Sequence, residues 1–240
     1  MALGAQLAAD FRQTHPPLDN APARDYIEQM GARLARALPQ PSPFTYHFEL
    51  TTDSGGTFLE PASLPSGYVF VPAGLILAAK DEAELAGTLA HAIAHVAGRH
   101  YTRQATKAEI AQMGAVPQFL WGGLAGYGAN QGQSVPVGML QFQKALESEA
   151  DRLAVGIASA AGYDPEGSAN YIGRVQQDPA QPASSAYSAF PPREQRAQAI
   201  EQAIQALPAK SYAASGDFGR IQEEVRRALP PSPPKPTLQR

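Results

Sequence analysis

Apolar residues recur at three- and four-residue steps along much of the chain, the spacing that places them on one face of a helix. Over residues 22–38 this stripe contains Tyr26, Ile27, Met30, Leu34 and Leu38, and prolines follow it. Asp81 stands where an N-cap is needed for a longer, alanine-rich stretch. The pattern predicts helices over residues 2–13, 22–38, 73–79, 82–108, 139–161, 167–177, 193–207 and 217–229.

Two short segments have the pattern of strands. Between residues 44 and 51, Phe44, Tyr46, Phe48 and Leu50 alternate with polar residues, which is typical of a half-buried strand. The second strand is expected over residues 68–71, where an apolar run follows Gly67 and ends before Pro72. Many helices and few strands together predict an α+β fold that is predominantly helical, with a small sheet.

The composition narrows the possible functions. The chain has 240 residues, of which 44% are hydrophobic and 17% charged, so it is long and apolar enough to form a real core. A net charge of −3 provides no basic surface for a nucleic acid, and we expect no such partner. The absence of cysteine excludes disulfides, thiolate metal ligands and cysteine nucleophiles.

Two segments differ in composition from the rest. Residues 110–143 contain no Asp, Glu, Lys or Arg, and two interpretations stay open: a plain glycine-rich loop, or a mobile lid or flap that makes peripheral contact with a membrane. Residues 230–240 contain five prolines and are expected to form a disordered tail after a single domain over residues 1–229. No apolar run reaches the ~18–20 residues of a transmembrane helix.

The candidate chemistry lies in the alanine-rich helix. His91 and His95 are four residues apart, so both imidazoles lie on one helix face and can hold one metal ion, usually zinc. In the zinc-peptidase motif HExxH a glutamate general base follows the first histidine, but here that residue is Ala92. Glu147 and Asp151, again four apart, suit a third ligand and a carboxylate that orients a ligand histidine.

Three neighbouring residues receive no role at the metal. Glu149 lies about 200° round the helix from Glu147, and we expect it to face solvent. Arg99 and His100 are expected to cap or pair on their own helix.

Several motifs in series resemble one family. His91-Ala-Ile-Ala-His95 is followed by Glu147-Ser-Glu-Ala-Asp151, an E-x-E-A-D motif, and then by the aGyDP turn at residues 161–165. Residues 64–71 resemble an L-P-G-G-Y-I segment. The chain resembles the gluzincin zinc metallopeptidases of the HtpX/BepA/CAAX-prenyl-protease family, peptidase family M48, over about residues 5–205.

The resemblance implies a gluzincin-type domain and a site. It implies a zinc endopeptidase in which His91, His95 and Glu147 bind one Zn²⁺ per chain and Asp151 orients a ligand. The edge strand of the small sheet is expected to lie over the active-site helix, and to consist of the substrate-binding residues Tyr68, Val69, Phe70 and Val71, on which a peptide or unfolded protein substrate adds as a further strand.

Three positions depart from the family pattern. Ala92 replaces the general base, so the chain as given is expected to be inactive. Ser66 replaces a glycine of the turn, which is tolerable if φ is negative there. Phe190 stands where soluble relatives often have a metal-approaching histidine, whereas Arg196 keeps the family's arginine position.

The alternatives concern both activity and compartment. Ala92 is either a deliberate Glu→Ala replacement, which we favour because the other site residues are kept, or the mark of a natural pseudopeptidase. The rival functions are a zinc-site module that binds peptides or partner proteins without catalysis, and a structural helical domain without metal. The resemblance implies an exported, periplasmic protein whose signal peptide is absent from this chain, with a cytoplasmic location as the alternative. Nothing in the sequence fixes the oligomeric state.

Overall fold

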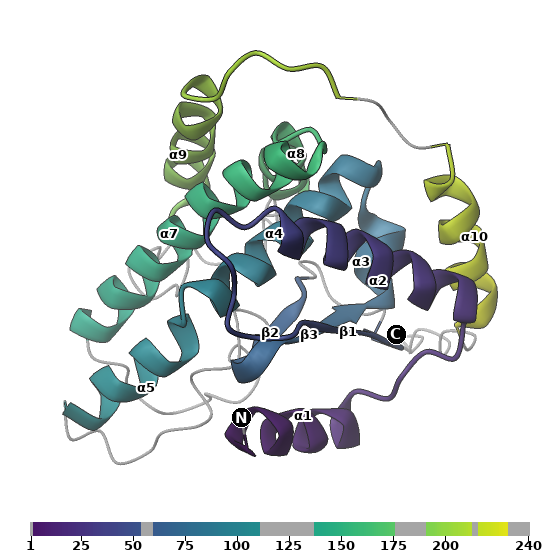
Figure 1. Cartoon of the computed structure of the whole chain (residues 1–240), viewed down its shortest axis with the longest axis horizontal. Coiled ribbons are helices and arrows are strands. Elements are labelled where there is room, and N and C mark those ends of the chain that lie inside the picture. Colours follow the sequence, from purple (N-terminus) through teal and green to yellow (C-terminus); the bar gives the residue numbers. More distant parts are fainter. Residues whose placement is uncertain (1, 54–59, 111–136, 176–190, 213–215, 230–240) are drawn as a thin grey trace, which may run out of the picture.

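The structure is a computed structural model (Figure 1), which describes all residues except 1, 54–59, 111–136, 176–190, 213–215 and 230–240. Its helices are α1 (Ala2–Thr14), α2 (Ala21–Arg36), α3 (Ala73–Ala78), α4 (Glu82–Ala97), α5 (His100–Ile110), α7 (Val137–Ala161), α8 (Glu166–Val175), α9 (Arg193–Gln205) and α10 (Phe218–Ala228). Its strands are β1 (His47–Thr51), β2 (Ala62–Leu64) and β3 (Tyr68–Pro72). Helices that surround one small sheet confirm the expected α+β class.

The three strands form one sheet in the order β1-β3-β2. β1 pairs with β3 in parallel, with Phe48 opposite Val69, and β2 pairs with β3 antiparallel, with Ser63 opposite Val69. The prediction that residues 68–71 form the edge strand is therefore wrong, because β3 is hydrogen-bonded on both sides. The edge next to α4 is β2, a three-residue strand too short to show alternation in the sequence. β1 begins at His47, later than expected.

Both faces of β3 are buried. Val69 and Val71 belong to the main core, which α2 and α4 share, whereas Phe70 packs with Leu7 and Phe11 of α1. Figure 1 shows α1 on the opposite side of the sheet from α2 and α4. A strand that is covered on both faces reads as a continuous apolar run, which explains the sequence of this segment.

Helix α4 lies at the centre of the fold. The Asp81 carboxylate accepts a hydrogen bond from the Glu84 amide (2.9 Å), so the predicted N-cap is confirmed. Helices α2, α7 and α8 pack around α4, and nearly every residue between Leu85 and Val96 is buried. Because α4 and α7 pack together, side chains from the two helices can meet in the interior.

The predicted helix over residues 82–108 is two helices. α4 ends at Ala97, and α5 starts at His100 after a break at Gly98 and Arg99. Arg99 has φ 53°, a left-handed conformation that a continuous right-handed helix excludes. The Gly98 amide donates to the Ala94 carbonyl (2.8 Å) and closes the last turn of α4. The chain therefore changes direction directly after the histidine pair.

Ser66 lies in the tight turn between β2 and β3. It has φ 69°, so the condition for tolerating serine at this position is not met. A non-glycine residue pays about 1–2 kcal/mol to adopt the left-handed region. Glycine avoids this cost, but its unfolded chain has more conformational entropy to lose on folding, which offsets part of the gain.

We expect Ser66→Gly to raise the free energy of unfolding by about 0.5–1 kcal/mol, measured by urea denaturation. Ser63→Gly in the regular strand β2 is the matched control and should lower this energy by a similar amount. Equal effects of the two substitutions would contradict strain at Ser66.

Several sequence-based predictions concern residues outside the described ones. They include the lid or membrane flap, of which residues 111–136 lie outside, and the tail over residues 230–240. The single domain over residues 1–229 also stays a prediction. Among the described residues, none of the helices combines the length and apolarity that a membrane crossing demands.

Candidate metal centre

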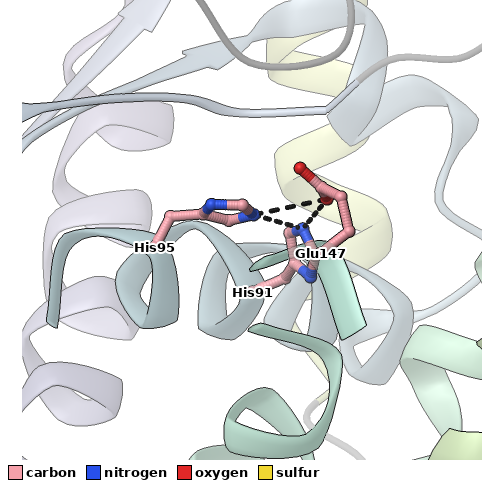
Figure 2. Close-up of side chains that lie close together, drawn as sticks. All are labelled: His91, His95 and Glu147. Carbon is pink, nitrogen blue, oxygen red and sulfur yellow. Dashed lines mark hydrogen bonds and ion pairs between the residues drawn. The ribbon is translucent and has the colours of Figure 1, made fainter. Parts of the chain in front are cut away.

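Two imidazoles from α4 point toward the same place. His91 and His95 lie one helical turn apart, and their Nε2 atoms approach to 2.9 Å, as Figure 2 shows. Their rings stand nearly edge to face, with centroids 4.6 Å apart. The i, i+4 spacing in the sequence therefore yields the convergent pair that it predicts.

Glu147 reaches this pair from α7. Its Oε2 atom lies 3.3 Å from Nε2 of His91 and 3.4 Å from Nε2 of His95 (Figure 2). This oxygen is buried, and among the described residues no group makes a hydrogen bond to it. Two imidazole nitrogens and one carboxylate oxygen, all within 4.8 Å of one another, form a donor set that zinc commonly takes. An orphaned oxygen between two ligand-type nitrogens fits a cation better than a hydrogen-bond network.

The charges at the site also favour a cation. Burial opposes ionisation of Glu147, but the two histidines outweigh it and hold the pKa of this carboxyl well below its usual range. Burial lowers the pKa of His91, but the nearby carboxylates of Asp151 and Glu147 outweigh burial and raise it to about 10. A metal ion bound by His91 must displace that proton, so its binding is coupled to proton release.

Asp151 supports His91 from the side away from Glu147. Its Oδ1 lies 2.9 Å from Nδ1 of His91, where a carboxylate can fix the ring's orientation. Arg196 of α9 donates two hydrogen bonds of 2.8 Å to the two oxygens of Asp151. Asp151 and Arg196 are 2% and 1% exposed, so this pair is fully buried. Arg196 thus acts through Asp151.

Sequence reasoning missed Glu60, which precedes β2. Its side chain is 13% exposed, and its Oε1 lies 3.9 Å from Nη1 of Arg196. Burial raises the pKa of Glu60, while the Arg196 charge lowers it less strongly. Three carboxylates, Glu60, Glu147 and Asp151, therefore lie around one arginine, and a divalent cation would balance their charge. No motif marks Glu60 in the sequence, because only the fold brings it to α9.

The structure also brings together residues that sequence reasoning left apart. Nδ1 of His100 lies 3.1 Å from Nδ1 of His95. Glu149 is 36% exposed and accepts hydrogen bonds from Arg103 of α5, so it lies at the surface, as expected, and pairs with a neighbouring helix. His100 also lies 3.6 Å from Glu149 of α7, a neighbour that the sequence did not predict, and the break after α4 turns its ring back toward His95.

The other predicted site residues have different positions. Ala92 is 1% exposed and lies on α4 directly after His91. Val69, Phe70 and Val71 are buried within the sheet, and with Tyr68 they belong to the central strand β3, so they provide no open edge for a substrate. Phe190 lies outside the described residues.

Comparison with known proteins identifies the family. The profile described as Peptidase family M48 matches residues 22–204, a range that contains α4, α7 and all the residues of the candidate metal centre. The chain belongs to peptidase family M48. The expectation from the sequence motifs is thereby confirmed at the level of the family.

Curated relatives of this M48 chain include two beta-barrel assembly-enhancing proteases. The protein from Yersinia pestis is 29% identical over 73% of this chain and 37% of its own length. The protein from Escherichia coli strain K12 is 26% identical over 80% of this chain and 39% of its own length. The chain thus spans under two fifths of the length of each of these relatives.

Proposed function

We propose that this chain is the zinc-binding domain of an M48 endopeptidase, which Ala92 keeps inactive. The observation that supports the proposal most directly is the convergence of Nε2 of His91, Nε2 of His95 and Oε2 of Glu147. These residues would hold Zn²⁺, and the ion would polarise the scissile carbonyl and lower the pKa of the attacking water. Asp151, held by Arg196, would keep His91 in the orientation that binding needs.

The missing step is proton transfer. In the family's HExxH motif the glutamate after the first histidine takes a proton from the attacking water and passes it to the leaving amine. The methyl group of Ala92 can do neither. The general base is missing whether Ala92 is a deliberate Glu→Ala replacement or the natural residue of a pseudopeptidase. The second candidate function is a zinc-site module that binds peptides without cleaving them. Ala92 is the one observation that favours it.

The substrate would bind along β2. Among the described strands, β2 has an unpaired edge and lies next to α4. An extended peptide that adds to this edge would pass close to the helix that carries His91 and His95. This proposal replaces β3 by β2 as the recognition strand and keeps an unfolded or extended protein as the substrate.

The proposal on partners and compartment rests on the relatives' name and on the family resemblance. Their name connects them with the assembly of β-barrel proteins. By resemblance, we propose that this chain binds protein substrates in an exported, periplasmic setting, and that a form with Glu at position 92 cleaves them.

The metal is the first quantity to measure. We expect native mass spectrometry to find about one zinc ion per chain, because Ala92 is not a ligand and three ligands remain. Removing one ligand by His91→Ala, His95→Ala or Glu147→Ala should abolish tight binding. His47→Ala, which removes an exposed imidazole from β1, is the matched control and should bind zinc like the parent. A parent chain that stays free of zinc after growth with added zinc would refute the proposed function.

A further inference from the structure

The break between α4 and α5 creates a contact that a straight helix could not make. Residues five apart on a continuous helix are rotated by about 140°, so His100 would face away from His95. Because Arg99 adopts φ 53°, His100 turns back, and the two Nδ1 atoms lie 3.1 Å apart. The rings meet edge to face, with centroids 4.8 Å apart.

His100 is held firmly in this place. It is 2% exposed. A Cβ atom added at Gly98 would come within 2.3 Å of its Nε2, so the backbone packs directly on the ring. On the outer side, Oε1 of Glu149 lies 3.6 Å from Nε2 of His100, and Arg103 donates hydrogen bonds of 3.1 and 2.9 Å to the same carboxylate. The helices α5 and α7 thus fix the ring from two directions.

We propose that His100 is a positioning residue that holds His95 in the tautomer and orientation needed to bind the metal; this rests on the proposed metal site. An imidazole that binds a metal through Nε2 carries its proton on Nδ1. That proton needs an acceptor, and Nδ1 of His100 is placed to accept it. The proton of His100 then lies on Nε2, which faces the Glu149 carboxylate. The two ligand histidines have different supports: Asp151 for His91 and His100 for His95.

The test separates the hydrogen bond from the volume of the ring. His100→Phe keeps an aromatic ring but has no acceptor, whereas His100→Asn is smaller but places an amide oxygen close to the position of Nδ1. Zinc affinity is measured by competition with a chelator of known affinity. We expect about 10–100-fold weaker binding for His100→Phe and largely retained binding for His100→Asn, with the stoichiometry unchanged. His47→Ala is again the control.

Two further measurements make the outcome decisive. Thermal unfolding in excess chelator shows whether each variant folds without metal, so that an unfolded variant is not mistaken for a weak binder. Long-range ¹H–¹⁵N spectra of the zinc-loaded parent should show His95 protonated at Nδ1, and His100→Phe should shift this signal. If folded His100→Phe binds zinc as tightly as the parent, the proposal is overturned. It is also overturned if His100→Phe binds zinc more tightly than His100→Asn, because the zinc affinity would then follow the volume of the side chain. A parent that binds no zinc would instead refute the proposed function.

Discussion

Ala92→Glu is expected to turn this chain into a peptidase whose activity a chelator abolishes. The substitution restores a carboxylate directly after the ligand His91, the position of the general base in the family motif. General acid–base catalysis of this kind typically contributes about 10²–10⁴-fold to the rate. The assay is cleavage of an unfolded protein such as casein, with and without chelator.

Burial of position 92 adds a second expectation. Because Ala92 is 1% exposed, the new carboxylate would be buried, and a buried charge is costly without a counter-charge. The metal can supply that charge. We therefore expect Ala92→Glu to be less stable than the parent in excess chelator and to recover when zinc is added.

Ala92→Gln is the matched control for this experiment. Glutamine has the size and shape of glutamate but cannot accept a proton from water at neutral pH. Activity in the glutamate variant and none in the glutamine variant would support an inactivated protease. If the glutamate variant folds, binds zinc and cleaves no member of a broad peptide library, the peptide-binding module is the better description.

The residues of the candidate metal centre that could be predicted from the sequence are those whose spacing one helix dictates. His91 and His95 on α4, and Glu147 and Asp151 on α7, are each four residues apart, and a helix turns both pairs toward one side. The structure brings all four together. Their order along the chain also matches the family motifs, and the resemblance implied that the two helices pack together, so their packing did not have to be predicted separately.

The residues that were missed depend on the path of the chain between elements. Glu60 reaches Arg196 only because β2 pairs with β3, and a three-residue strand has no periodicity to detect. His100 reaches His95 only because Arg99 adopts a left-handed conformation. Gly98 is a single glycine between two segments that each favour a helix, the first of them alanine-rich, so local propensity predicted one continuous helix. Because β2 was not predicted from the sequence, β3 was expected to be the edge strand, whereas β2 occupies that edge.

Breaking the buried pair of Asp151 and Arg196 is expected to have the largest effect on stability. The two side chains are 2% and 1% exposed and share two hydrogen bonds of 2.8 Å. Arg196→Met leaves the buried Asp151 carboxylate with His91 as a remaining cationic neighbour but without its two arginine hydrogen bonds, and removing one partner of a buried pair typically costs about 3–5 kcal/mol. Urea denaturation at neutral pH in excess chelator measures this loss without a contribution from metal binding. Arg193→Met, at a more exposed arginine of the same helix, is the control and should change stability little.

The pH dependence identifies the charge as the cause. Burial opposes ionisation of Asp151, but Arg196 outweighs burial and holds the pKa below its ordinary value of 3.8. A carboxyl whose pKa is lowered by folding stabilises the native state fully above its unfolded pKa and loses that contribution as the pH falls through the folded pKa. Without Arg196 the pKa of Asp151 in the folded variant is higher than in the parent, so the stability difference should be largest at neutral pH and shrink as the pH falls through the pKa of Asp151 in the variant. The double variant Asp151→Asn/Arg196→Met should regain part of the loss, because the carboxylate that lost its arginine is replaced by a neutral amide. A single variant as stable as the parent at neutral pH would show that the pair contributes no net stability to the fold.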